Sequence, residues 1–149
     1  MTGVRAERFV VLNLRLLAAA FAIVGILFIA VPDGTLSALD DLGDWLPLGE
    51  FSPAPDTQEQ LWLALAFAYM VVITGICLVV QADVVRYRPL LLVLAAGKAA
   101  SSLAALGFYL FDDDVFPYLL NFVVDGYLVF VSLLLWSLAG RVGAPAALS

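Results

Sequence analysis

The sequence predicts an all-α integral membrane protein, an antiparallel four-helix transmembrane bundle with a short amphipathic external helix. Three observations predict it. Of the 149 residues, 64% are hydrophobic and 13% are charged, whereas about a quarter of a typical soluble domain is charged. Four apolar runs are long enough to cross the ~30 Å hydrocarbon core of a bilayer as helices. The charged residues lie mostly between these runs, and their sign alternates from one connection to the next.

The four spans are predicted over residues 9–31, 61–80, 90–111 and 115–139. They use most of the chain, so we expect a single membrane domain with no room for a soluble catalytic module. We expect the first span to be a retained helix, because Arg15 would interrupt the apolar region of a signal peptide and the apolar run is too long for one.

The connection over residues 32–60 is long for a small bundle. Its apolar residues recur at a spacing of three to four, with aspartates largely on the other faces, which favours a short amphipathic helix on the outer surface. Gly43 argues against a fully regular helix. The apolar positions are Leu36, Leu39, Leu42, Trp45 and Leu46.

The charges between the spans predict the orientation. Arginines lie in the N-terminal segment, in the connection between the second and third spans, and in the C-terminal tail, and the other two connections contain no Lys or Arg. By the positive-inside rule, both termini are cytoplasmic and both acidic loops are external, in a cell (inner) membrane. The external acidic surface would repel nucleic acid and attract cations or basic partners. It comprises Asp40, Asp41, Asp44, Asp112, Asp113 and Asp114.

The sequence lacks the residues that several kinds of catalytic and metal site require. The chain has no histidine, which excludes histidine-ligated haem, the usual zinc sites and Ser/His nucleophile arrangements. Cys77 is the only cysteine and lies within the second span. The aspartates at 112–114 lack the glycine and downstream glutamate of an EF-hand loop. We therefore expect no catalytic residues, no metal and no cofactor.

Two charges of opposite sign lie inside the third and fourth spans. Counting 1.5 Å per residue along each helix puts Lys98 and Asp125 within about 4 Å of the same depth, so we predict an ion pair between them. Gly97, Ser101 and Ala105 form a small-xxx-small series that permits close helix approach, and we expect the third span at the centre of the bundle. The candidate intramembrane polar cluster is Lys98, Ser101, Ser102, Asn121, Asp125 and Arg15.

The polar cluster has two interpretations. In the first it is structural, and pairing offsets an insertion cost of ~2.5–3.5 kcal/mol for each central charge. In the second it is a proton or ion relay, or a polar pocket for a lipid-like or quinone-like ligand. Arg15 either extends its side chain to the lipid phosphates or joins Lys98 in a basic pocket that faces the cytoplasm.

The chain resembles the DoxX-like group of small four-helix bacterial membrane proteins. The shared features are a first span that ends in a Pro-containing loop, an acid-rich external stretch, the sequence from Gly97 to Ser101 in the third span, and Asp125 in the fourth. Where the group suggests arginine, this chain has Lys98. The resemblance implies an integral membrane protein, in some members associated with redox or respiratory enzymes, and it transfers no catalytic motif.

Together these features predict a non-enzymatic accessory or assembly subunit of a bacterial inner-membrane complex. Its partners would be the lipid bilayer and larger membrane-protein subunits, or further copies of itself. The alternative is a small oligomeric proton-coupled transporter or channel that uses the Lys98 and Asp125 pair. An enzyme acting on a lipid-soluble substrate has the least support, because nothing resembles a nucleophile and base.

Overall fold

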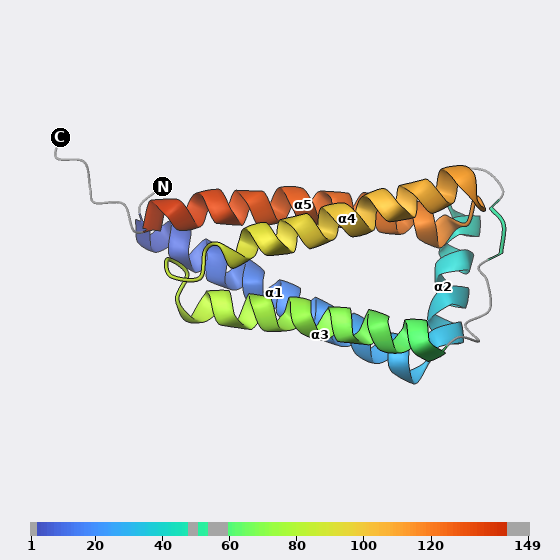
Figure 1. Cartoon of the computed structure of the whole chain (residues 1–149), viewed down its shortest axis with the longest axis horizontal. Coiled ribbons are helices and arrows are strands. Elements are labelled where there is room, and N and C mark those ends of the chain that lie inside the picture. The colour runs from blue at the N-terminus through green and yellow to red at the C-terminus, as the bar shows by residue number, and fades with distance from the viewer. Residues whose placement is uncertain (1–2, 48–50, 54–59, 143–149) are drawn as a thin grey trace.

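The computed structural model describes residues 3–47, 51–53 and 60–142, and over these residues the chain forms five helices. The all-α fold class predicted from the sequence is confirmed. The helices are α1 (Gly3–Ala30), α2 (Pro32–Trp45), α3 (Gln60–Ala82), α4 (Leu90–Phe111) and α5 (Phe116–Val142), shown in Figure 1.

Four helices, α1, α3, α4 and α5, are long and apolar enough to cross a membrane. Their outward faces carry large apolar side chains, among them Leu16, Leu103 and Phe130, all more than 60% exposed. A monomeric soluble protein rarely exposes a contiguous apolar patch of more than a few hundred Å². A surface of this kind is what lipid contact requires, and the chain has the character of a membrane protein.

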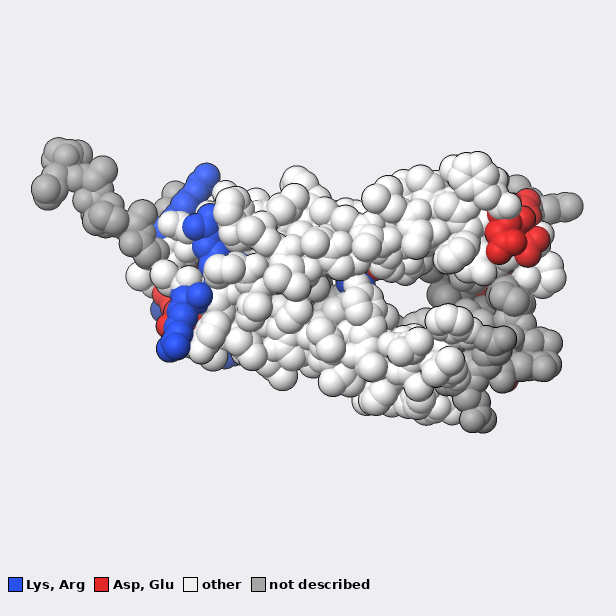
Figure 2. Space-filling view, in the orientation of Figure 1, with Lys and Arg blue, Asp and Glu red and all other residues white. Residues whose placement is uncertain are grey.

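Charged side chains gather at the two ends of the molecule. Lys and Arg side chains lie near one end, and a cluster of acidic side chains lies near the other (Figure 2). The first, which we call the basic end, holds the start of α1, the α3–α4 connection and the end of α5 (Figure 1). The second, which we call the acidic end, holds α2 and the turn between α4 and α5.

The helices pack as two pairs, α1 with α3 and α4 with α5. We expected α4 at the centre of the bundle, and this expectation is wrong: α4 packs mainly on α5, whereas α1 contacts α2, α3 and α5. The reason is that the polar side chains of α4 form hydrogen bonds with α5; these are Lys98, Ser101 and Ser102.

The pairs are joined by an apolar core in the half of the molecule nearer the basic end. Its members include Val10 and Leu14 of α1, Leu91 of α4, and Leu135 of α5, all at most 1% exposed. Arg88, just before α4, donates a hydrogen bond from Nε to the carbonyl oxygen of Trp136, at 2.8 Å. Toward the acidic end the two pairs diverge, and α2 lies across the opening (Figure 1).

Helix α2 occupies the stretch in which a fifth helix was predicted. Only Val31 separates it from the end of α1. Pro32 lies in its first turn, where the missing N–H of proline does no harm. Gly43, expected to disturb the helix, is buried within it. A Cβ atom at Gly43 would lie 2.7 Å from the Phe116 ring, so glycine at this position allows α2 to contact the start of α5.

Candidate functional site

The predicted ion pair between Lys98 and Asp125 is present. Lys98 lies about 12 Å along α4 from Leu90, and Asp125 about 13.5 Å along α5 from Phe116. The Lys98 Nζ atom is 2.9 Å from Asp125 Oδ1, and the two side chains are 2% and 5% exposed. A buried charge is tolerated when a partner of opposite sign is within hydrogen-bond distance, and each residue supplies that partner to the other.

Aromatic rings from the other helix pair cover the ammonium group. Lys98 Nζ lies 4.4 Å from the centre of the Phe21 ring of α1 and 5.1 Å from that of Tyr69 of α3. Both distances fall in the range of cation–π attraction. One lysine side chain therefore contacts residues of three other helices, and all four long helices meet at this point.

The sequence patterns did not identify Phe21 or Tyr69. Each is one of many aromatic residues in an apolar run, and only the packing of α1 and α3 against α4 brings them to Lys98. The Tyr69 hydroxyl is buried and has no hydrogen-bond partner among the described residues. A Cβ atom at Gly97 would lie 3.4 Å from this hydroxyl oxygen, so Gly97 lies directly beside it.

Two further polar contacts join α4 and α5 next to the ion pair. The Ser102 hydroxyl donates to the carbonyl oxygen of Phe122 at 2.8 Å. The Asn121 amide Nδ2 donates to Ser101 Oγ at 3.2 Å. The structure thus brings five of the six predicted polar residues to the contact between α4 and α5.

Arg15 lies away from this cluster. Its Nε donates to Gln81 Oε1 of α3 at 3.3 Å, and its side chain is exposed. It lines a surface hollow at the basic end together with Glu7 and Arg8, whereas Lys98 is buried. The two cations do not share a pocket, so the interpretation as a joint basic site is not supported by the geometry.

A cavity of about 520 Å³ lies between the two helix pairs on the acidic side of the ion pair. Its walls come from α1, α2, α4 and α5 and are mainly apolar, with Phe28, Leu36 and Phe108 among them. Ser101 and Asn121 also line it. Tyr118 lines it too, so the cavity combines apolar walls with residues that carry an amide and hydroxyl groups, of which Ser101 and Asn121 lie one helical turn from the ion pair.

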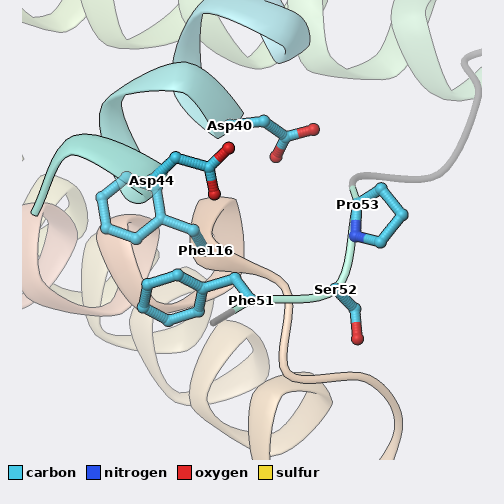
Figure 3. A pocket seen from close by; sticks show the side chains of 6 residues that line it. All are labelled: Asp40, Asp44, Phe51, Ser52, Pro53 and Phe116. Carbon is cyan, nitrogen blue, oxygen red and sulfur yellow. The ribbon is translucent and has the colours of Figure 1, made fainter. Parts of the chain in front are cut away.

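The acidic end has a smaller pocket of about 130 Å³ (Figure 3). Asp40 and Asp44 of α2 border it, and the rings of Phe51 and Phe116, 5.1 Å apart, form its base. Ser52 donates a hydrogen bond to Asp114 Oδ1 at 2.7 Å, which ties the chain after α2 to the turn before α5. Across the described part of the chain, no three acidic or thiol side chains are grouped so that they could hold a metal ion.

Comparison of the chain with family models, with curated proteins and with solved structures gave no match.

Proposed function

We propose that this chain is a non-enzymatic accessory or assembly subunit of a bacterial inner-membrane complex. In this proposal the four long helices form an antiparallel transmembrane bundle with both termini in the cytoplasm, as the positive-inside rule favours. The resemblance to DoxX-like proteins points in the same direction, since some members of that group are associated with redox or respiratory enzymes.

The observation that carries the proposal is the contrast between the charges inside the molecule and those at the acidic end. Inside, Lys98 and Asp125 neutralise each other at 2.9 Å and are nearly fully buried. This arrangement suits a packing element, because a relay group must exchange protons with a path to water. The pair therefore supports a structural role.

At the acidic end the charge is not balanced. The sequence from 32 to 60 and the residues 112–114 contain no Lys or Arg. The carboxylates that give this end its charge are those of the external acidic surface, and potentials of this kind steer and orient partners of opposite charge. A basic external segment of a larger subunit fits this surface.

Native mass spectrometry tests the proposal, using tagged protein extracted from its own host in a mild detergent. We expect a complex of fixed stoichiometry with larger membrane subunits. A variant with Asp112→Asn, Asp113→Asn and Asp114→Asn should retain less of the partner at low salt than the unmodified protein. Added salt should weaken the variant's complex less, because the variant lacks three of the charges whose attraction salt screens, over about 3 Å at 1 M. A monomer or homo-oligomer without other subunits would contradict the proposal.

A proton-coupled transporter is the second candidate, and one observation favours it. Tyr69, whose ring lies 5.1 Å from Lys98 Nζ, has a buried hydroxyl with no hydrogen-bond partner among the described residues. Asn121 and Ser101 connect the next turn of α4 and α5 to the cavity. Proton flux into vesicles that contain only this protein would support the transporter, provided that Asp125→Asn abolishes the flux and Ser132→Ala does not.

A further inference from the structure

Asn121 places an amide where the surroundings are apolar. It lies about 7.5 Å along α5 from Phe116, and its side chain is exposed to the cavity that it lines. Among the described residues the Asn121 side chain forms one hydrogen bond, which Nδ2 donates to Ser101 Oγ. No described residue forms a hydrogen bond with the amide oxygen or the second N–H, on a side chain that lines the cavity.

An unpaired amide is costly in hydrocarbon, where no water is available to replace the missing partner. A bound ligand that forms hydrogen bonds with the Asn121 amide would remove this cost. The amide can both donate and accept, and the Ser101 hydroxyl beside it can do the same. The polar part of the site therefore matches a hydroxyl or a carbonyl group.

The apolar walls of the cavity indicate the non-polar part of the ligand. The apolar lining from α1, α2, α4 and α5 fits a hydrocarbon chain, and the volume of about 520 Å³ lies within the ~300–1,000 Å³ of typical small-molecule sites. The helix pairs diverge on this side (Figure 1), and all four long helices are apolar enough to cross a membrane. A molecule dissolved in the bilayer is thus the class of ligand that the cavity fits.

The charges exclude an anionic ligand. The described residues that line the cavity include no Lys or Arg, and Lys98, three residues before Ser101 on α4, is already neutralised by Asp125 at 2.9 Å. The cavity is bordered on its outer side by α2, which carries four aspartates and no Lys or Arg. A negatively charged head group would be repelled there and would find no counter-ion.

We infer that this cavity is a binding site for one uncharged long-chain lipid whose polar group is a hydroxyl or a carbonyl. Asn121 and Ser101 bind the polar group, and the walls that include Phe28, Leu36 and Phe108 hold the chain. This site is independent of any partner at the acidic surface.

Photolabelling tests the inference, with the full-length protein in phosphatidylcholine nanodiscs. The probe is hexadecanol with a diazirine in its chain, and the sulfate ester of the same alcohol is the anionic counterpart. We expect the alcohol to label peptides of α4 and α5, unlabelled hexadecanol to compete, and the sulfate ester to label weakly.

Three variants make the test specific. Asn121→Leu removes the amide at a position where leucine is well tolerated in hydrocarbon, and the loss of one hydrogen bond should reduce labelling about fivefold. Ala104→Leu keeps the amide and fills the cavity, which Ala104 lines, and should reduce labelling at least as much. Ala100→Leu makes the same change at an exposed position of α4 that does not line the cavity, and labelling should stay at the level of the unmodified protein.

Bulk lipid contact alone would give a different result. Equal labelling of all variants, equal labelling by the sulfate ester, absence of competition, or labelling of the unmodified protein no stronger than that of Ala104→Leu would each overturn the inference. Thermal unfolding of each variant confirms that a loss of label does not come from unfolding.

Discussion

The Lys98 ammonium lies 4.4 Å from the centre of the Phe21 ring, so a charge on α4 contacts an aromatic face on α1. The two helices belong to different pairs, and their pairs diverge toward the acidic end. The contact is therefore a point at which the two pairs are held together. The Asp125 carboxylate, 2.9 Å from the ammonium, makes the contact possible by neutralising its charge.

Removal of either partner of the ion pair is expected to be much more costly than removal of both. Lys98→Met or Asp125→Leu leaves one buried charge without a partner, and each should lower the free energy of unfolding by about 3–5 kcal/mol. The double variant leaves no charge and should be close to the unmodified protein. Unfolding in mixed detergent micelles measures the effect, and additive losses in the double variant would contradict a coupled pair.

The serines of α4 and α5 offer a matched comparison. Ser102 donates to Phe122 on the neighbouring helix, whereas Ser132 donates to Leu128 in its own helix, each at 2.8 Å. Ser102→Ala should therefore lower the free energy of unfolding by about 0.6 kcal/mol, and at most ~1.7 kcal/mol, the range of interhelical hydrogen bonds in membranes. Ser132→Ala should have a smaller effect, because it breaks no contact between helices. An equal loss in both variants would mean that the bond to Phe122 does not stabilise the packing of α4 on α5.

Gly43 controls how closely α2 approaches α5. In Gly43→Ala the new Cβ atom would lie 2.7 Å from Phe116, and such overpacking costs about 1–3 kcal/mol. Gly34→Ala is the control, since its Cβ atom would meet only the Val31 side chain, at 3.9 Å, and alanine is the better helix former by ~0.5–1 kcal/mol.

The unfolding temperature of Gly34→Ala should therefore be higher than that of the unmodified protein, and that of Gly43→Ala should be lower. A second change, Phe116→Ala, removes Cγ and Cδ1, two of the three atoms that would obstruct the new methyl group. The losses caused by Gly43→Ala and Phe116→Ala should therefore be less than additive in the double variant. If the two glycine variants have the same stability, α2 does not pack on α5 as described.

The fold class could be predicted from the sequence because hydrocarbon imposes simple requirements on length and composition. The run over 90–111 coincides with α4, whereas α1 starts at Gly3, ahead of the apolar run that begins at residue 9. The helix continues there because backbone hydrogen bonding does not end where the side chains become polar. The ion pair was predictable for a similar reason: a short connection, the four residues between α4 and α5, fixes the relative depth of Lys98 and Asp125.

The contacts between the helix pairs could not be predicted in this way. Phe21 and Tyr69 lie far from Lys98 in the sequence, and periodicity does not indicate which face of α1 or α3 turns toward α4. The small residues of α4 led to the expectation of a central helix, yet Ser101 and Ser102 face α5, and Ala105 and Ser101 line the cavity. Small side chains permit close packing, but they do not identify the neighbouring helix.

Arg88 is expected to stabilise the basic end through its planar guanidinium group. It donates to the Trp136 carbonyl oxygen, and its Cζ atom lies 4.1 Å from the centre of the Trp136 ring. Lysine does not reproduce stacking and a directed Nε–H bond together, so Arg88→Lys should lower stability by about 1–2 kcal/mol. Arg86→Lys is the control, because Arg86 is exposed and lies over the ring of its neighbour Tyr87 at 5.3 Å. Tryptophan fluorescence during unfolding measures the stability of both variants. If Arg88→Lys and Arg86→Lys are equally stable, Arg88 does not have the role described.

The orientation in the membrane is tested by chemical labelling of single cysteines. Cys77 is buried, and Cys77→Ala gives a background without thiols. Ser37→Cys places a thiol at an exposed position of α2 at the acidic end, and Ala82→Cys places one at an exposed position at the end of α3. Neither change removes an arginine, so the charge pattern that directs insertion stays intact.

In intact cells, a membrane-impermeant maleimide should modify Ser37→Cys and leave Ala82→Cys unmodified until the membrane is permeabilised. This result follows if the arginines of the basic end stay in the cytoplasm and the carboxylates of the acidic end face outward. The reverse pattern would place the acidic end inside, and the proposed docking partner would then have to be cytoplasmic. Labelling of both positions in intact cells would mean that the two ends lie on the same side, which is incompatible with helices α1, α3, α4 and α5 each crossing the membrane once.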